Sequence, residues 1–108
     1  MALSLPAFDF GRRVAPRAMF VNGAGVAADP TTVRWRIRPP SGAEVLVTAS
    51  GGAYTLDSPA VGTHRLLFTP PTPGRWVVRC EGLGAVEQAV EGEFLVRSPR
   101  LTSASIAP

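Results

Sequence analysis

The stretch TVRWRIR, residues 32–38, decides the fold of this chain. Apolar and charged side chains alternate along it, which is the pattern of a β-strand with one buried face and one solvated face. The apolar face comprises Val33, Trp35 and Ile37, and the charged face comprises Arg34, Arg36 and Arg38. The sequence PPSG at residues 39–42 ends the strand, because proline cannot donate a hydrogen bond to a ladder and Ser-Gly favours a turn.

Similar short runs lie on both sides of this strand. We expect further strands at residues 12–21 with an interruption at Pro16, and at 44–48, 53–56, 64–69, 76–81 and 86–97. Eleven glycines and eleven prolines separate these runs, and no segment has the periodicity of a helix. The pattern predicts an all-β fold, an immunoglobulin-like antiparallel β-sandwich of about seven to eight strands. We expect strands 64–69 and 76–81 to be antiparallel neighbours, since a proline-rich turn joins them.

The length of 108 residues, 45% of them apolar, fits one domain. We predict the sandwich at residues 7–97, an N-terminal arm at 1–6 and a C-terminal arm at 98–108. Both arms carry small and polar residues with isolated apolar ones, and Leu101 and Ile106 are therefore candidate protein contacts. Residues 1–6 lack the basic start and apolar stretch of a secretory signal, and no apolar run reaches membrane-spanning length. We expect synthesis in a cytoplasm and no membrane partner.

Residues that carry chemistry are scarce. Cys80 is the only cysteine and His64 the only histidine, so one chain supplies neither a disulfide nor the ligands of a structural zinc site. No nucleophile elbow, HExxH pair, phosphate loop or CxxC motif occurs. We therefore predict no catalytic residue, cofactor or metal, and no enzyme; an enzymatic alternative would have to start from His64 and a nearby acid. We interpret Cys80 as a core thiol and His64 as a residue at the rim of the sandwich.

The two tryptophans separate two classes of function. Trp35 and Trp76 both fall on apolar faces of expected strands, so we predict that they belong to the core. The alternative is a carbohydrate- or receptor-binding adhesion module, which needs aromatic side chains outside the core and a polar cleft. The directions of Trp35, Trp76 and Tyr54 therefore distinguish the two hypotheses.

The row formed by Arg34, Arg36 and Arg38 is the clearest candidate binding feature. Three interpretations are open. The row is a solvated strand face, it pairs across the sheet with Glu87, Glu91 and Glu93, or it docks on an acidic protein surface. Nucleic acid is a weaker partner, because eight acidic residues offset the eleven arginines and no nucleic-acid-binding motif is present.

Five short motifs occur in a recognisable order: DPTTV at 29–33, PSG at 40–42, PGRW at 73–76, GLG at 82–84 and EGEFLV at 91–96. In this order they resemble small immunoglobulin-like proteins of tailed phages and prophages, over about residues 10–97. The resemblance implies a non-enzymatic virion structural protein that decorates the capsid or lies at the neck or tail. It also implies that the partners are other virion proteins and that the chain is present in many copies.

Overall fold

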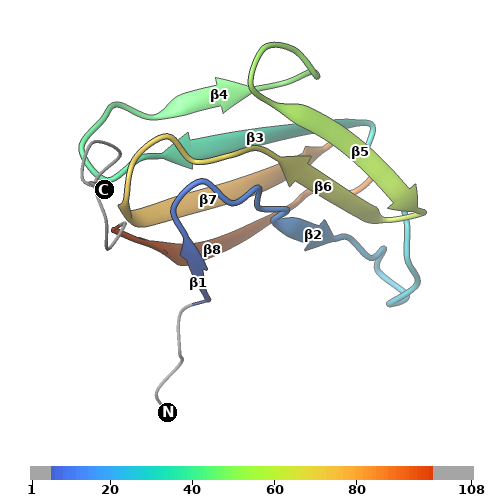
Figure 1. Cartoon of the computed structure of the whole chain (residues 1–108). Helices are drawn as coiled ribbons and strands as arrows, with labels where there is room; N and C mark the ends of the chain where they lie inside the picture. The colour runs from blue at the N-terminus through green and yellow to red at the C-terminus, as the bar shows by residue number, and fades with distance from the viewer. Residues whose placement is uncertain (1–5, 99–108) are drawn as a thin grey trace, which may run out of the picture.

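The computed structural model describes residues 6–98 and shows two packed β-sheets (Figure 1). The larger sheet has five strands in the order β1 (Ala7–Asp9), β8 (Gln88–Arg97), β7 (Gly74–Leu83), β3 (Thr32–Arg38) and β4 (Val45–Val47). The smaller sheet has three strands in the order β2 (Arg17–Met19), β6 (Thr63–Leu67) and β5 (Thr55–Ala60). The chain is an all-β, immunoglobulin-like sandwich, as predicted. Residues 6–98 include no helix that is long and apolar enough to cross a membrane.

β3 has the bounds that the sequence predicts and lies near the middle of the large sheet. It pairs with β7 along its whole length, and Trp35 is directly opposite Cys80. Trp35, Ile37 and Cys80 are buried, whereas the arginines of β3 lie on the opposite face. The alternation of side chains therefore places the core between the two sheets, as the sequence indicates.

The predicted pairing of the strand at 64–69 with the strand at 76–81 is wrong. β6 pairs with β2 and β5 in the small sheet, whereas β7 pairs with β3 and β8 in the large sheet. Residues 70–73 contain three prolines, which cannot donate ladder hydrogen bonds and favour an extended chain. The chain therefore crosses from one sheet to the other at this point, and the two strands meet through their side chains.

The structure also shows a strand that the sequence analysis did not predict. β1 pairs in parallel with the end of β8, with Ala7 opposite Leu95 and Asp9 opposite Arg97. Apart from β3, the predicted strands also differ from their observed bounds, most clearly β2 and β5. β2 is shorter than expected and starts just after Pro16, and β5 starts at Thr55 and extends to Ala60.

An aromatic cluster fills one end of the core. The rings of Trp76 and Phe94 are stacked, with centroids 6.2 Å apart, and the Phe68 ring packs against both. Trp35 and Trp76 are each only 2% exposed, which confirms that both belong to the core. The indole N–H of Trp76 donates to the carbonyl of Thr72 at 3.0 Å, so this buried polar group has a partner.

Both predicted arms lie almost entirely outside the described residues. Only Pro6 and Ser98 of the ranges 1–6 and 98–108 are described. The candidate contacts Leu101 and Ile106 also lie outside them.

Candidate functional site

The outer face of the five-stranded sheet carries a row of alternating charges that crosses three strands, β8, β7 and β3. The register between β3 and β7 places Arg34 directly opposite Glu81, and Arg36 opposite Arg79. The register between β7 and β8 places Arg79 opposite Glu91. Side chains directly opposite each other on one face of a sheet lie within reach of one another. The backbone pairing alone therefore brings these charged groups together.

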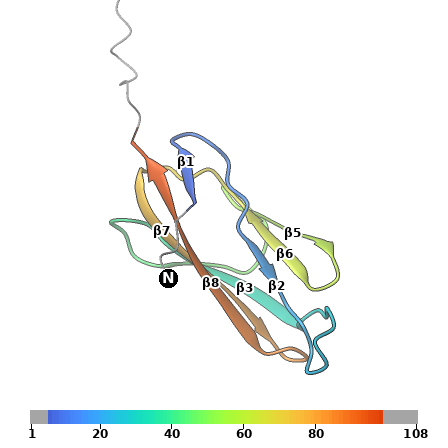
Figure 2. The same ribbon diagram turned by 90° about the horizontal axis from the view of Figure 1, so that it is seen from below.

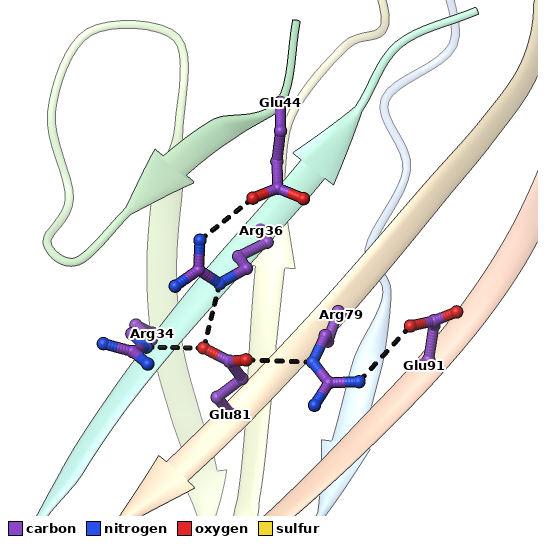
Figure 3. A network of polar contacts seen from close by, with 6 residues as sticks. All are labelled: Arg34, Arg36, Glu44, Arg79, Glu81 and Glu91. Carbon is purple, nitrogen blue, oxygen red and sulfur yellow. Dashed lines mark hydrogen bonds and ion pairs between the residues drawn. The ribbon is translucent and has the colours of Figure 1, made fainter.

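Glu81 is the centre of this arrangement (Figure 3). Its Oε1 accepts a hydrogen bond from Nε of Arg34 at 2.5 Å and another from Nε of Arg36 at 3.0 Å. Its Oε2 accepts a hydrogen bond from Nε of Arg79 at 2.9 Å. The Glu81 side chain is only 15% exposed, because the three guanidinium groups cover it. Three charge-assisted hydrogen bonds thus fix one carboxylate in the middle of the sheet face.

Two further carboxylates extend the row outwards. Nη1 of Arg36 donates to Glu44 at 2.9 Å, and Nη1 of Arg79 donates to Glu91 at 3.4 Å. We call the resulting set of side chains the Glu81 network. It consists of Arg34, Arg36, Glu44, Arg79, Glu81 and Glu91. Figure 3 shows that it extends from β8, across β7 and β3, to Glu44 just before β4.

The charges of the Glu81 network act on the acidity of its central group. Hydrogen bonds from Arg79, Arg34 and Arg36 lower the pKa of Glu81 from 4.5 to about 2. Glu81 therefore stays ionised throughout the neutral and mildly acidic range. The same hydrogen bonds raise the pKa of Arg36 and of Arg79, each of which bonds Glu81 and a second carboxylate.

The Glu81 network is balanced in charge but not saturated in hydrogen bonds. Its three arginines match its three glutamates. Arg34 uses only Nε, so both of its Nη nitrogens have no hydrogen bond to another described residue. Arg34 and Arg36 keep about a third of their side chains exposed, at 33% and 31%. The guanidinium groups are thus held in place while part of their donor edges faces solvent.

Arg38 differs from the other two arginines of its row. It is exposed and makes no ion pair with any residue from 6 to 98. It borders a shallow depression of about 70 Å³ together with Arg36, Glu44 and Val77. An exposed apolar side chain lies on the same face. Leu46 of β4 is directly opposite Arg36 of β3, and it is 50% exposed. The β4 side of the face therefore combines an unpaired cation with apolar surface.

Of the three interpretations of the arginine row, its pairing with Glu87, Glu91 and Glu93 is excluded by the strand order. β7 lies between β3 and β8, so the two rows are not neighbours. Arg34 and Arg36 pair with Glu81 and Glu44 instead. Of the acidic row, Glu91 pairs with Arg79, and Glu93 with Arg75 at 3.5 Å. The sequence analysis missed Arg79 and Glu81, although their alternation with Val78 and Cys80 indicates that they face outwards.

Neither Cys80 nor His64 is part of the Glu81 network. Cys80 is fully buried, and burial raises the pKa of its thiol to about 12. His64 is at the rim of the sandwich, and its Nε2 lies 3.2 Å from Oδ1 of Asp29. The same Asp29 oxygen accepts the backbone N–H of Gly62 at 2.7 Å. Cys80 is therefore a core residue, and His64 takes part in a local contact that holds a turn.

Comparisons with known proteins give one informative match. The sequence matches no protein-family model and no curated protein. Among solved structures, the chain is similar to the filamin domain in the crystal structure of Lin-41, with a TM-score of 0.64 and 14% identity. The match covers 89% of this chain and 87% of that one. At this level of identity the similarity supports the immunoglobulin-like fold alone.

Proposed function

We propose that this chain is a non-enzymatic structural protein of a tailed-phage virion that binds other virion proteins through the outer face of its five-stranded sheet. The choice of this face as the binding surface is based on the Glu81 network, in which one shielded carboxylate holds three arginines in place. The order of the five sequence motifs supports the placement in a virion, at the capsid, neck or tail.

The geometry suits contact with a protein surface that offers carboxylates and apolar groups. Arginine side chains lose conformational freedom when they bind, and this loss weakens a complex. Glu81 already holds Arg34, Arg36 and Arg79 in fixed positions, so less freedom remains to be lost. The free Nη nitrogens of Arg34 and the unpaired Arg38 are placed to receive a partner's carboxylates, and Leu46 supplies an apolar contact.

A small contact area is sufficient for such a role. Specific protein interfaces bury about 800 Å² on each partner, and weaker ones bury less. When many copies bind a symmetric shell or ring, each additional contact is formed at a high effective concentration. Moderate binding by one face can therefore give stable incorporation into a particle. We propose that Leu101 and Ile106 add to this binding.

The carbohydrate-binding alternative receives no support from the tryptophans. Trp35 and Trp76 are buried, and Tyr54 packs against Phe68 with 5.5 Å between the ring centroids. A sugar platform needs aromatic faces that are open to solvent. We therefore do not propose sugar or receptor binding.

The proposal is tested on assembled particles. Particles produced with the gene in its native setting are purified by density gradient, and quantitative mass spectrometry measures this chain relative to the major capsid protein. We expect a fixed ratio that survives repeated purification. Loss of the chain from purified, infectious particles would exclude a virion role.

Two variants then test the binding face itself. Arg38→Ser removes the unpaired cation, and Arg34→Lys keeps the charge but removes the forked donor edge. We expect each to lower incorporation while the purified protein remains folded by circular dichroism. Arg12→Ser, at an exposed residue between β1 and β2 that is not part of the Glu81 network, is the matched control. Equal incorporation of all three variants would assign the binding to another surface.

A further inference from the structure

The strand β8 has an open edge beside the core. It has ten residues, but β1 pairs with only three of them, Leu95, Val96 and Arg97. On this side of β8, no described strand pairs with residues 89–93. Figure 2 shows β1 at one end of β8, with β2 alongside the remainder of the strand. The part of the edge that no described strand covers is thus about five residues, or roughly 16 Å, long.

The backbone of this edge is oriented for strand pairing. The N–H of Leu95 donates to the carbonyl of Pro6 at 2.9 Å, so the peptide groups of Leu95 point toward β1. In a strand these groups point to alternate sides, and those of Ala89, Glu91 and Glu93 therefore point the same way as those of Leu95. They form a row of donors and acceptors that a neighbouring extended chain can pair with.

A groove of about 330 Å³ lies next to this row. We call it the β8 groove. One wall comes from residues 90–94 of β8, the other from residues 14–18, and the core residues Trp35 and Val78 also line it. Val90 faces the inner side of the sheet opposite Cys80, yet it remains 37% exposed. At Gly92, no other part of residues 6–98 lies within 4 Å of the position that a Cβ would take.

Described residues mark both ends of the open stretch of β8. Pro6 and Phe8 line the β8 groove at the β1 end. At the other end, Oε1 of Gln88 accepts the backbone N–H of Val21 at 3.1 Å, which joins β8 to the chain that follows β2. The stretch of β8 between these contacts has the length of a short extended segment, in which every second side chain would point toward the core.

The charges beside the edge indicate which segment fits. The outward side chains next to the open edge are Glu91 and Glu93, which are 56% and 39% exposed. Their ion pairs with Arg79 and Arg75 are long, at 3.4 and 3.5 Å. A strand added here places its own outward side chains beside these carboxylates, and opposite charges in such positions stabilise the pair. A second copy joined edge to edge through β8 would instead place these glutamates against themselves.

We propose that residues 89–93 bind an extended segment of a partner protein by β-strand addition. The segment carries aliphatic side chains at alternate positions, which enter the β8 groove, and arginine or lysine between them, which face Glu91 and Glu93. The backbone pairing provides affinity that depends little on sequence, and the groove and the glutamates provide the selectivity. This site shares Glu91 with the Glu81 network but uses the open backbone edge of β8, and it does not depend on the virion proposal.

The test uses a synthetic blocked peptide of about five residues with alternating valine and arginine, which matches the length of the open edge, added to the full-length protein. Two-dimensional NMR of the labelled protein follows each backbone amide. We expect the largest shifts and new protection from hydrogen exchange at Ala89, Glu91 and Glu93. A peptide with glutamate in place of arginine should bind at least about tenfold more weakly, and so should a peptide of the same composition without alternation.

Variants of the protein separate backbone pairing from charge attraction. Glu91→Pro removes an N–H that points to the open edge and leaves the pairing with β7 intact, because that pairing uses the peptide groups of Val90 and Gly92. Glu91→Ala keeps the N–H and removes only the charge. We expect the proline variant to lose at least about tenfold in affinity and the alanine variant to lose less.

Three results would overturn the proposal. They are the absence of binding by the alternating peptide, shifts that map to the edge of β4 or β2, and self-association of the protein through residues 89–93 in sedimentation experiments. If Glu91→Pro does not fold, the hydrogen-exchange protection of the wild-type protein decides. Unchanged exchange at Glu91 and Glu93 in the presence of peptide would exclude strand addition.

Discussion

The ring centroids of Phe68 and Trp76 lie 5.7 Å apart, although Phe68 directly follows β6 of the small sheet and Trp76 lies in β7 of the large sheet. Phe68 also packs against Tyr54 and Phe94, so it is the central ring of the aromatic cluster. The proline-rich segment between residues 68 and 76 thus connects the two layers of the sandwich at a point where their side chains already hold them together.

Phe68→Ala should therefore be among the most destabilising substitutions in the core. Phe68 is 3% exposed, and removal of a buried phenylalanine ring typically costs about 3–5 kcal/mol in the free energy of unfolding. Urea denaturation followed by tryptophan fluorescence measures this loss. Phe10→Ala, at a residue that is 43% exposed, is the matched control and should change stability little. A loss below about 1 kcal/mol at Phe68 would contradict the packing described.

Glu81→Gln should make stability less dependent on acid pH. The folded-state pKa of Glu81, about 2, lies below its ordinary value of 4.5. The stabilisation from its ionised form is therefore complete above pH 4.5 and is lost as the pH falls toward 2. At pH 7 we expect the variant to be about 1–2 kcal/mol less stable than the wild type, because charge-assisted hydrogen bonds are weakened.

The difference between the two proteins should shrink as the pH falls through this window. Thermal denaturation at a series of pH values measures it, with Glu87→Gln, at an exposed residue, as the control for loss of one negative charge. A constant difference between the two proteins from pH 7 to about pH 2 would show that Glu81 contributes no pH-dependent stability.

Gly62→Ala should destabilise the turn between β5 and β6. Gly62 has a φ of +77°, a conformation that residues with a side chain seldom adopt. A Cβ at this position would also lie 2.6 Å from the carbonyl oxygen of Phe20. We expect a loss of about 1–3 kcal/mol, measured by chemical denaturation. Gly23→Ala, where the Cβ would meet nothing within 4 Å, is the control.

Cys80 should react with thiol reagents only when the protein opens. Its side chain is fully buried, and burial raises the pKa of the thiol to about 12, so both access and ionisation are restricted. At pH 8 we expect labelling of the native protein to be at least about a hundredfold slower than labelling in denaturant. Mass spectrometry over time measures both rates. Rapid labelling of the native protein would show that β7 is accessible from the surface.

The strands were largely predictable because their pattern is local. Trp35, Ile37 and Cys80 alternate with charged residues, and a period of two fixes which side chains face the core. β1 was not predictable in this way, because three residues carry almost no pattern. Its neighbour is also far away in the sequence, as the contact between Asp9 and Arg97 spans 88 positions.

The candidate site was predictable only in part, since it depends on the order of the strands. The sequence places Arg34 and Arg36 on an outer face, but it does not show that β7 separates them from the acidic row of β8. Their partner Glu81 follows from the β3 and β7 register, which is a property of the folded sheet. The crossing at residues 70–73 was missed for a related reason, because a proline-rich turn is compatible with both a hairpin and a change of sheet.

The parallel pairing of β1 with β8 has a consequence for biosynthesis. A chain grows on the ribosome from its N-terminus, so residues 7–9 are made first and their partners, residues 95–97, almost a whole domain later. Closing so large a loop is slow compared with forming the hairpin of β5 and β6. We therefore expect the pairing of β1 with β8 to form at the end of folding. In a nascent chain that stalls before Leu95, β1 has no partner strand.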